Sequence, residues 1–279
     1  MLWRCRTRTF DLARRTLVMG IVNVTPDSFS DGGRFLDPAA AIDHGRRLLR
    51  DGADVLDVGA ESTRPGAAPV PAAEQLDRLR PVLEALAPVA PVSVDTASAK
   101  VAEAALGLGA EGVNDVTALR DPAMAPLVAA SGAGLVMMHM RGTPETMQDD
   151  PRYDDVTRVV SAWLEVRLGA ARRAGIDPEQ VVLDPGIGFG KTARHNFELL
   201  ARLEELGTLG RPLLVGVSRK RFLGAALDLP PGERLEGGLA ATAVAVLHGA
   251  RVVRTHDVAA TVRAVRIADE LRAARRAPG

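Results

Sequence analysis

The sequence has few of the features that would place it outside the reducing interior of a cell. Cys5 is its only cysteine, so no internal disulfide can form, and a single thiol favours a reducing compartment. The first sixteen residues contain no apolar signal core, and no uncharged apolar run approaches the roughly 18 residues of a membrane helix. Basic and acidic residues balance at 35 each, which argues against a nucleic-acid or membrane-surface protein. We therefore expect a soluble, cytoplasmic protein without nucleic-acid or membrane partners.

Lysine is also scarce. Of the 35 basic residues, 32 are arginine and only three are lysine: Lys100, Lys191 and Lys220. Because the two side chains are not interchangeable, a chain that uses arginine almost everywhere is expected to keep lysine where an ammonium group is needed. Lys220 is the strongest candidate for such a position.

Apolar, β-branched runs alternate along the chain with segments of helical spacing. The strands are predicted near 17–22, 54–58, 91–94, 112–114, 134–139, 180–184, 212–217 and 251–255. The helices are predicted at 38–51, 72–86, 98–108, 122–130, 155–174, 196–206 and 238–248, with a last helix from about 259 to the end. Eight repeats of strand and helix predict a single-domain (β/α)8 barrel over residues 1–279. A doubly wound open sheet is the alternative, disfavoured by the count of eight and by the absence of GxGxxG after the first strand.

Polar residues follow every predicted strand. The site of such a barrel lies at the C-terminal ends of its strands. In chain order, these ends carry Asn23; Glu61 to Pro65; Asp95; Asn114 and Asp115; His139 and Arg141; Asp184, Phe189 and Lys191; Ser218 to Lys220; and Arg254 and His256. An isolated Asp after a strand often caps the next helix, and a lone His is more often structural than catalytic. Polar residues at all eight predicted strand ends are much harder to explain by packing.

The polar groups differ between the two sides of the predicted barrel. Asn23, Thr63, Arg254 and His256 come from strands 1, 2 and 8, which become neighbours when the barrel closes. Guanidinium and amide groups of this kind suit a phosphate-bearing ligand with Mg²⁺ held at Asn23. Asp95, Asn114 and Asp184 follow strands 3, 4 and 6, where they can accept hydrogen bonds from a flat heterocycle. No nucleophile elbow is present, which argues against a covalent intermediate through serine.

Eight motifs together resemble those of the dihydropteroate synthase family of folate biosynthesis. They are GIVNVTPDSFSDGG, DVGAESTRPGA, SVDT, VNDV, MHMRG, DPGIGFGK, GVSRKRFLG and RTHDV, in that order, within residues 17–260. Ala60 and Thr255 replace the Gly and Val that are usual in the family, and both changes are conservative in size.

The resemblance implies a reaction and a set of site residues. The family joins 6-hydroxymethyl-7,8-dihydropterin diphosphate to 4-aminobenzoate and releases pyrophosphate, and we expect a dissociative substitution assisted by Mg²⁺. It implies a homodimer, inhibition by sulfonamides, and catalytic roles for Asn23, Asp95, Lys220, Arg254 and His256. The pterin would contact Asp95, Asn114, Met138, Asp184, Phe189, Gly216 and Lys220, and the diphosphate would contact Asn23, Thr63, Arg254 and His256. The 4-aminobenzoate would contact Phe29, Ser62, Thr63, Arg64, Pro65, Phe189, Ser218 and Lys220.

Two other functions remain as alternatives. A pterin-dependent methyltransferase that acts with a corrinoid protein would need the pterin pocket but neither the anion pocket nor the STRPG and SRK loops. A catalytically silent paralogue would bind a pterin or a partner without turnover. A generic sugar-phosphate barrel enzyme fits these motifs less well than either.

Overall fold

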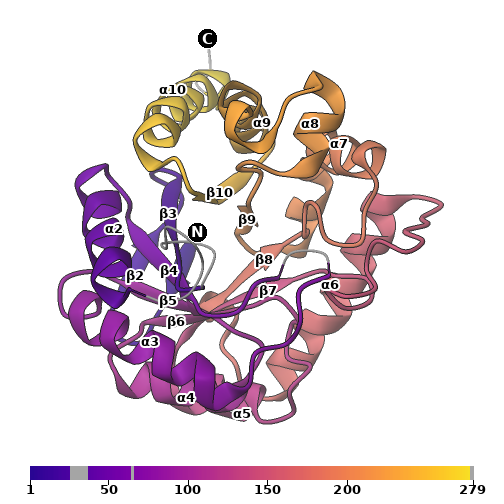
Figure 1. The fold of residues 1–279 in the computed structure, drawn as a ribbon. Coiled ribbons are helices and arrows are strands. Elements are labelled where there is room, and N and C mark those ends of the chain that lie inside the picture. The colour runs from indigo at the N-terminus through magenta and orange to yellow at the C-terminus, as the bar shows by residue number, and fades with distance from the viewer. Residues whose placement is uncertain (26–36, 64–65, 277–279) are drawn as a thin grey trace.

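A computed structural model describes residues 1–25, 37–63 and 66–276 of the chain as a closed barrel of eight parallel strands. Figure 1 shows the strands at the centre and the helices around them. The strands follow one another around the barrel in the order β10-β3-β4-β5-β6-β7-β8-β9. Their bounds are β3 Leu17–Asn23, β4 Val55–Gly59, β5 Val92–Asp95, β6 Gly112–Asp115, β7 Gly134–Met138, β8 Val181–Asp184, β9 Leu213–Val215 and β10 Ala250–Thr255. The predicted barrel is confirmed, and each predicted strand is found.

A ring of helices covers the outside of the barrel. They are α2 Pro38–Arg50, α3 Ala72–Leu86, α4 Ala99–Gly107, α5 Met124–Ser131, α6 Val156–Arg173, α7 Ala193–Ala201, α8 Arg221–Leu227, α9 Leu235–Leu247 and α10 Val258–Arg276. Three short 3-10 helices, η1 Pro178–Gln180, η2 Leu203–Leu209 and η3 Pro231–Glu233, lie in connections. The sequence did not predict α8, which lies between β9 and α9. None of the helices in the described ranges is both long and apolar enough to span a membrane.

Aspartate caps explain several helix starts. Asp37 precedes Pro38 and accepts a hydrogen bond from the Ala39 backbone N–H at 2.9 Å, as the Asp-Pro pair predicts. The Asp-Pro pair at 121–122 behaves differently, because α5 begins only at Met124. Asp121 Oδ1 accepts from the backbone N–H of Ala123 at 3.0 Å, and its Oδ2 accepts from that of Ala99 at 2.9 Å, at the start of the neighbouring helix α4. A cap can therefore serve a helix other than the one that follows it.

An N-terminal hairpin that the sequence analysis did not predict packs at the N-terminal end of the barrel. Strands β1 Leu2–Arg4 and β2 Thr9–Asp11 pair antiparallel, and β1 lies against β8 and η1. Trp3 is 1% exposed, and its indole Nε1 donates to the Gln180 carbonyl at 3.0 Å. Its apolar cluster joins Trp3, Cys5, Leu12, Leu17, Met19, Val55, Val136, Val182, Leu214 and Val252. This end of the barrel is thus filled by apolar side chains.

Candidate active site at the C-terminal ends of the strands

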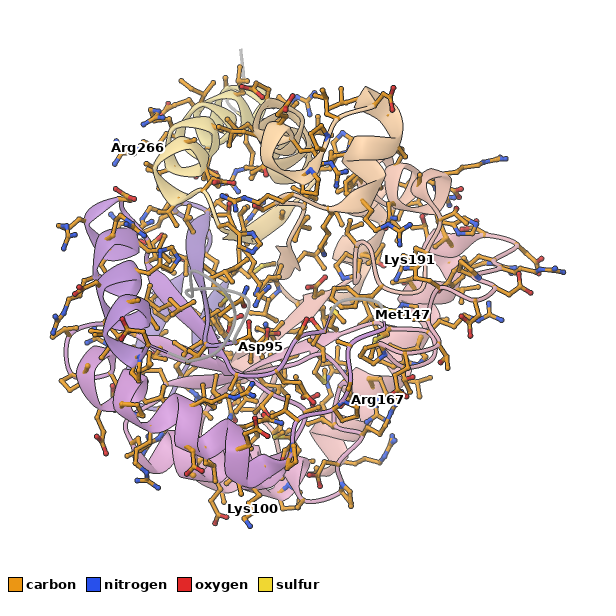
Figure 2. All side chains as sticks on the ribbon, in the orientation of Figure 1. Asp95, Lys100, Met147, Arg167, Lys191 and Arg266 are labelled. Carbon is orange, nitrogen blue, oxygen red and sulfur yellow. The ribbon has the colours of Figure 1, made fainter. Side chains whose placement is uncertain are left out.

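Arg254 links two carboxylates inside the C-terminal mouth of the barrel. Its Nε donates to Asp57 Oδ2 at 2.6 Å, and its Nη2 donates to Asp95 Oδ2 at 2.7 Å. Asn114 Nδ2 donates to the same Asp57 oxygen at 3.0 Å. Residues from β10, β4, β5 and β6 therefore form one hydrogen-bonded network, and Figure 2 shows Asp95 near the barrel axis.

Asp57 is the member of this network that sequence reasoning missed. It lies within strand β4 rather than after it, and its side chain is fully buried. Within the described ranges its Oδ1 has no hydrogen-bond partner, although a buried acceptor normally has one. An aspartate inside the apolar run Val55–Gly59 was the signal that could have identified it, because an unpaired buried carboxylate is costly.

Burial and ion pairing have opposite effects on the pKa values of the charged groups in this network. Burial raises the pKa of Asp95 to about 7, although Arg254 opposes the shift. Burial by itself lowers the pKa of Arg254, but Asp57 and Asp95 outweigh it and raise that pKa above its usual value. Arg254 therefore stays charged, and it supplies positive charge at the mouth of the barrel.

Asp184 and Lys220 lie on the other side of the mouth, around the loop 185–191. Asp184 Oδ1 accepts from the Gly186 backbone N–H at 2.7 Å, and burial raises the pKa of this carboxyl against the opposing charge of Lys220. Lys220 Nζ donates to the Ile187 carbonyl and lies 4.8 Å from the centre of the Phe189 ring. Burial lowers the pKa of Lys220 to about 8, so its ammonium is still protonated at neutral pH. The predicted residues Asp184, Phe189 and Lys220 thus surround one loop.

Two further predicted residues lie beside these groups. A Cβ on Gly216 would lie 3.6 Å from Arg254 Cβ and 3.9 Å from Lys220 Nζ, so Gly216 lies between the two cations. Met138 is buried in an apolar cluster with Val116, Met140 and Met147, against which Phe189 packs. This cluster offers an apolar wall to a flat ligand.

Ser218 and His256 form a second polar group, with Asp257. Ser218 Oγ lies 3.1 Å from His256 Nδ1, and the backbone N–H of His256 donates to Ser218 Oγ at 3.3 Å. Arg219, whose φ of 59° is in the left-handed region, pairs with Asp257 at 2.6 Å. These contacts connect the loop after β9 to the loop after β10. They place Ser218, predicted to contact 4-aminobenzoate, beside His256, predicted to contact the diphosphate.

The remaining predicted residues come from the loops after β3 and β4. Asn23 ends β3 and pairs with Gly59, while Ser62 and Thr63 are half-buried beyond β4. Phe29, Arg64 and Pro65, which were assigned to 4-aminobenzoate, lie outside the described residues.

The strand-end residue Asp115 and two histidines of the helical segments, His195 and His248, have structural roles. Asp115 accepts from the backbone N–H groups of Thr117 at 2.8 Å and Leu119 at 2.6 Å, so it stabilises its own loop. His195 caps helix α7 with Thr192. His248 Nδ1, in the tautomer that carries its proton there, donates to the Leu200 carbonyl at 3.1 Å. These contacts agree with the structural interpretation of isolated Asp and His residues.

The donor groups of the described residues bear on whether this site can hold a metal ion. Within the described ranges, no group of three or more His, Cys, Asp and Glu side chains could hold a metal ion. Mg²⁺ commonly uses one or two protein ligands and takes its remaining oxygens from phosphates and water. A single amide oxygen at Asn23 therefore fits a magnesium ion that arrives with a diphosphate, rather than one held by the protein alone.

Comparison with known proteins gives one consistent result. The family model described as "Pterin binding enzyme" matches residues 19–256. The dihydropteroate synthase of Escherichia coli K12 is 45% identical over 254 residues, which cover 90% of each chain. A Yersinia pestis dihydropteroate synthase structure with a sulfonamide drug has a TM-score of 0.92 at 43% identity, covering 98% of this chain and 100% of that one. A Xanthomonas albilineans dihydropteroate synthase structure with 4-aminobenzoic acid has a TM-score of 0.90 at 46% identity, with full coverage of both chains.

Proposed function

The chain belongs to the pterin-binding enzyme family, and we infer that it is a dihydropteroate synthase of folate biosynthesis. It joins 6-hydroxymethyl-7,8-dihydropterin diphosphate to 4-aminobenzoate, with release of pyrophosphate. The observation that carries this inference is the network of Asp57, Asp95, Asn114 and Arg254 facing Asp184 and Lys220 at one end of the barrel.

The pterin is assigned to the space bordered by Asp95, Asn114, Asp184 and Lys220. Two buried carboxylates can accept from the ring and amino N–H donors of a pterin, while Lys220 can donate to its acceptors. Desolvation strengthens each of these hydrogen bonds and penalises any polar atom left unpaired. Met138 and Phe189 would pack against the ring, since both belong to the same apolar wall.

The diphosphate is assigned to Asn23, Thr63, Arg254 and His256. Two of the guanidinium nitrogens of Arg254 are hydrogen-bonded to Asp57 and Asp95. We propose that Arg254 therefore acts on the leaving diphosphate mainly through its fixed positive charge and through Nη1. Asn23 would hold Mg²⁺ with the diphosphate oxygens, and the ion would supply charge neutralisation for the leaving group.

The second substrate is assigned to the loops after β4 and β9. Ser62, Thr63, Ser218 and Lys220 would contact 4-aminobenzoate, together with Phe189. Support comes from the Xanthomonas relative, whose structure holds 4-aminobenzoic acid, and from the Yersinia relative, which holds a sulfonamide drug. A sulfonamide should therefore compete with 4-aminobenzoate on this chain.

The proposed chemistry needs positioning and charge more than a strong base. Departure of the diphosphate leaves positive charge on the pterin methylene, and the buried carboxylates of Asp95 and Asp184 supply negative potential nearby. The amine of 4-aminobenzoate is neutral at pH 7 and attacks that carbon directly. Orientation and exclusion of water account for the rest of the rate.

A turnover assay tests this function. Pyrophosphate release should require both the pterin diphosphate and 4-aminobenzoate, and the product should be 7,8-dihydropteroate. Pterin binding without pyrophosphate release would support the silent paralogue instead. Methyl transfer to a corrinoid protein would support the methyltransferase.

We also propose a homodimer. Phe197, Leu227 and Val244 are 42%, 45% and 42% exposed and lie on α7, α8 and α9, which contact one another. Exposed apolar groups gathered on adjoining helices are typical of a subunit interface. In sedimentation velocity, Phe197→Asp should shift the protein toward monomer, whereas Ile267→Asp on α10 should not. An unchanged dimer in Phe197→Asp would exclude this surface.

We further propose that the protein acts in the cytoplasm. The support is the single buried thiol, Cys5, which suits a reducing compartment. Fractionation of cells that produce the protein tests this, and activity in a periplasmic or membrane fraction would contradict it.

A further inference from the structure

The three lysines of the chain occupy different environments, and the proposed reaction gives a role only to Lys220. Lys100 is exposed on α4, far from the mouth of the barrel in Figure 2. Lys191 is 3% exposed and ends the loop 185–191. A buried ammonium is costly, so its contacts require an explanation.

Lys191 makes three short contacts beneath this loop. Its Nζ donates to the carbonyls of Gly186 and Phe189, both at 2.9 Å, and lies 3.0 Å from His139 Nδ1. Burial lowers the pKa of His139 to about 2, so its imidazole is neutral and Nδ1 can accept when the proton is on Nε2. Three acceptors match the three donors of the ammonium form of Lys191, which predominates below pH 7 because burial lowers its pKa to about 7. The three contacts join the end of β7 to two points of the loop.

The loop itself leaves little room for movement. Gly186 has a φ of 69°, and a Cβ at this position would overlap the His139 carbonyl. Gly190 has a φ of 61°, and its Cβ would lie 2.8 Å from the Arg141 carbonyl. Glycine at both positions lets the loop pack directly onto the chain after β7.

The part of the loop between these anchors holds Lys220. The Ile187 carbonyl accepts from Lys220 Nζ, and the Phe189 ring lies 4.8 Å from that atom. Because Lys191 fixes residues 186 and 189 by their carbonyls, it fixes the positions of the Ile187 carbonyl and the Phe189 ring as well.

We propose that Lys191 is a positioning residue for pterin binding, which acts by holding the loop 185–191 against Lys220. The proposal rests on the proposed function, because it takes Lys220 as a pterin-binding residue. It explains why an ammonium is kept here, since a planar guanidinium fork does not match three acceptors arranged around one atom.

A double-mutant cycle on pterin affinity tests the proposal. Isothermal titration calorimetry of a diphosphate-free pterin is carried out on Lys191→Met, Lys220→Met and the double variant, with Lys100→Met as the matched control. We expect about a tenfold loss for Lys191→Met, a larger loss for Lys220→Met, and a double variant within twofold of Lys220→Met. Lys100→Met should bind like wild type.

The outcomes separate this inference from the proposed function. The role of Lys191 is overturned if the fold loss of pterin affinity in the double variant equals the product of the two single losses. It is also overturned if folded Lys191→Met binds the pterin like wild type. Unchanged affinity in Lys220→Met would instead contradict the assigned pterin site. If Lys191→Met does not fold, Lys191→Gln, which keeps an N–H donor, enters the same cycle and is judged by the same coupling.

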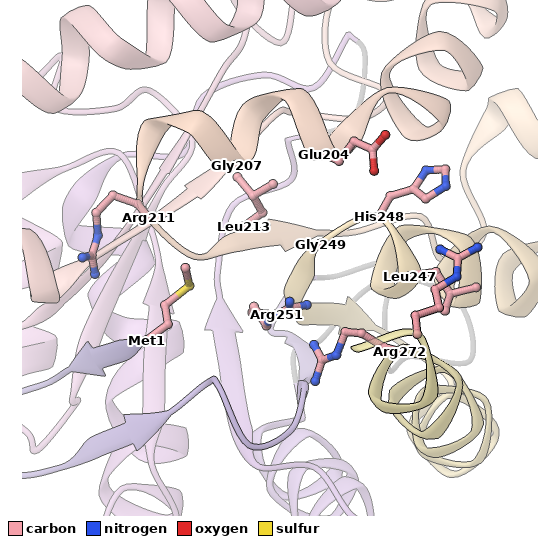
Figure 3. Close-up of a pocket in the computed structure, with 11 residues that line it drawn as sticks. Met1, Glu204, Gly207, Arg211, Leu213, Leu247, His248, Gly249, Arg251 and Arg272 are labelled. Atoms are coloured by element: carbon pink, nitrogen blue, oxygen red, sulfur yellow. The ribbon is translucent and has the colours of Figure 1, made fainter. Parts of the chain in front are cut away.

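A cavity at the opposite end of the barrel carries a second, independent inference. It has a volume of about 280 Å³ and lies where β9 and β10 begin (Figure 3). Four arginines line it, Arg211, Arg251, Arg272 and Arg275, together with His248, whereas Glu204 is the one carboxylate among the described residues that line it. Such an excess of guanidinium groups around one cavity favours an anion.

Arg272 has unused hydrogen-bonding capacity beside this cavity. Arg251 and Arg272 both line the cavity and are 8% and 7% exposed. Arg272 Nη2 pairs with Asp269 at 2.9 Å, whereas its buried Nη1 has no hydrogen-bond partner among the described residues. The guanidinium group would have to turn for Nη1 to meet an acceptor in the cavity.

We propose that this cavity binds a small phosphate-bearing molecule, with the phosphate between Arg251 and Arg272. Arginine recognises phosphate oxygens in pairs, and the volume approaches the roughly 300 Å³ at which small-molecule pockets begin. The site is separate from the candidate active site, because it lies at the other ends of the same strands.

Calorimetry on the full chain tests this site with orthophosphate, pyrophosphate and ATP as probes. The active site is first saturated with 7,8-dihydropteroate, and because this product leaves the assigned diphosphate residues open, only binding that is lost in Arg272→Gln or Arg275→Gln is counted for the cavity. Arg272→Gln or Arg275→Gln should weaken the tightest probe at least tenfold, and Arg266→Gln, an exposed residue of the same helix, should not.

The probes identify the source of the phosphate. If only ATP binds, the ligand is a nucleotide. If pyrophosphate binds as tightly as ATP, the ligand is a free phosphate. Either result supports the site. No binding by any probe, or equal affinities in Arg275→Gln, Arg272→Gln and wild type, would overturn it.

Discussion

The two ends of this barrel are built from the same strands but have opposite interiors. At the N-terminal end, Trp3, Leu12 and Met19 are at most 1% exposed and belong to one apolar cluster. At the C-terminal end, Asp57 and Asp95 share Arg254. The hydrophobic effect thus fills the inside of the barrel at its N-terminal end, with the arginine-lined cavity beside β9 and β10 outside that cluster. The inside of the C-terminal end instead holds buried charges that a core built only for stability would avoid. The difference assigns stability to one end and chemistry to the other.

Trp3→Ala should produce the largest change and affect stability alone. Truncating a buried Trp costs about 3–5 kcal/mol of unfolding free energy. Urea denaturation measures this loss, and kcat/KM at low temperature should stay within twofold of wild type. A large loss of kcat/KM in the folded variant would contradict the proposal that the N-terminal end contributes only to stability.

Asp184→Asn should produce the converse result. Its amide would present a donor to the N–H groups of the pterin, which costs about 3 kcal/mol, or roughly 100-fold in affinity. Calorimetry with a diphosphate-free pterin measures the loss, while the urea midpoint should change little. Near-normal affinity would mean that Asp184 only stabilises its loop through Gly186.

Arg254→Ala should weaken binding of the diphosphate half of the first substrate more than binding of its pterin half. Affinity for the pterin diphosphate should fall at least tenfold more than affinity for a diphosphate-free pterin, because charge facing the leaving group is lost. Some loss is expected for both ligands, since Asp57 and Asp95 lose a shared partner. Equal losses for the two ligands would contradict the anion role.

The smallest effect is a pH dependence of stability from Lys191. Burial lowers its pKa to about 7, so between pH 7 and 10 the unfolded chain binds a proton that the folded chain does not. Unfolding free energy should therefore rise with pH in this window by about 1 kcal/mol per pH unit relative to Lys191→Met. Urea denaturation of both proteins at pH 7.5 and 9 measures it, and parallel stabilities would show that Lys191 is not neutralised by burial.

The sequence predicted the C-terminal end of the barrel better than the N-terminal end. Strand ends are found by apolar runs that stop at polar residues, and Asp95, Asn114, Asp184 and Arg254 follow that rule. Asp57 was missed because it lies inside β4, where its pairing with Arg254 depends on barrel closure. The hairpin was missed because its three-residue strands gain their stability from Trp3, through contacts with distant strands.

Helix boundaries were also predicted less well where they depend on contacts between distant parts of the chain. Local capping correctly predicted the start of α2, where Asp37 caps its own helix. The start of α5 was predicted two residues early, because Asp121 also serves α4. Helix α8 was missed because its seven residues are too few for a helical period to be distinguished from a loop.

A crystal structure with bound pteroic acid would test the central claim most directly. The pterin ring should lie in the C-terminal mouth, with its amino-pyrimidine edge on Asp184 and its ring beside Lys220. The benzoate end should point toward Ser218. Density for the pterin at any other place, with the C-terminal mouth unchanged, would contradict the assignment of chemistry to this end of the barrel.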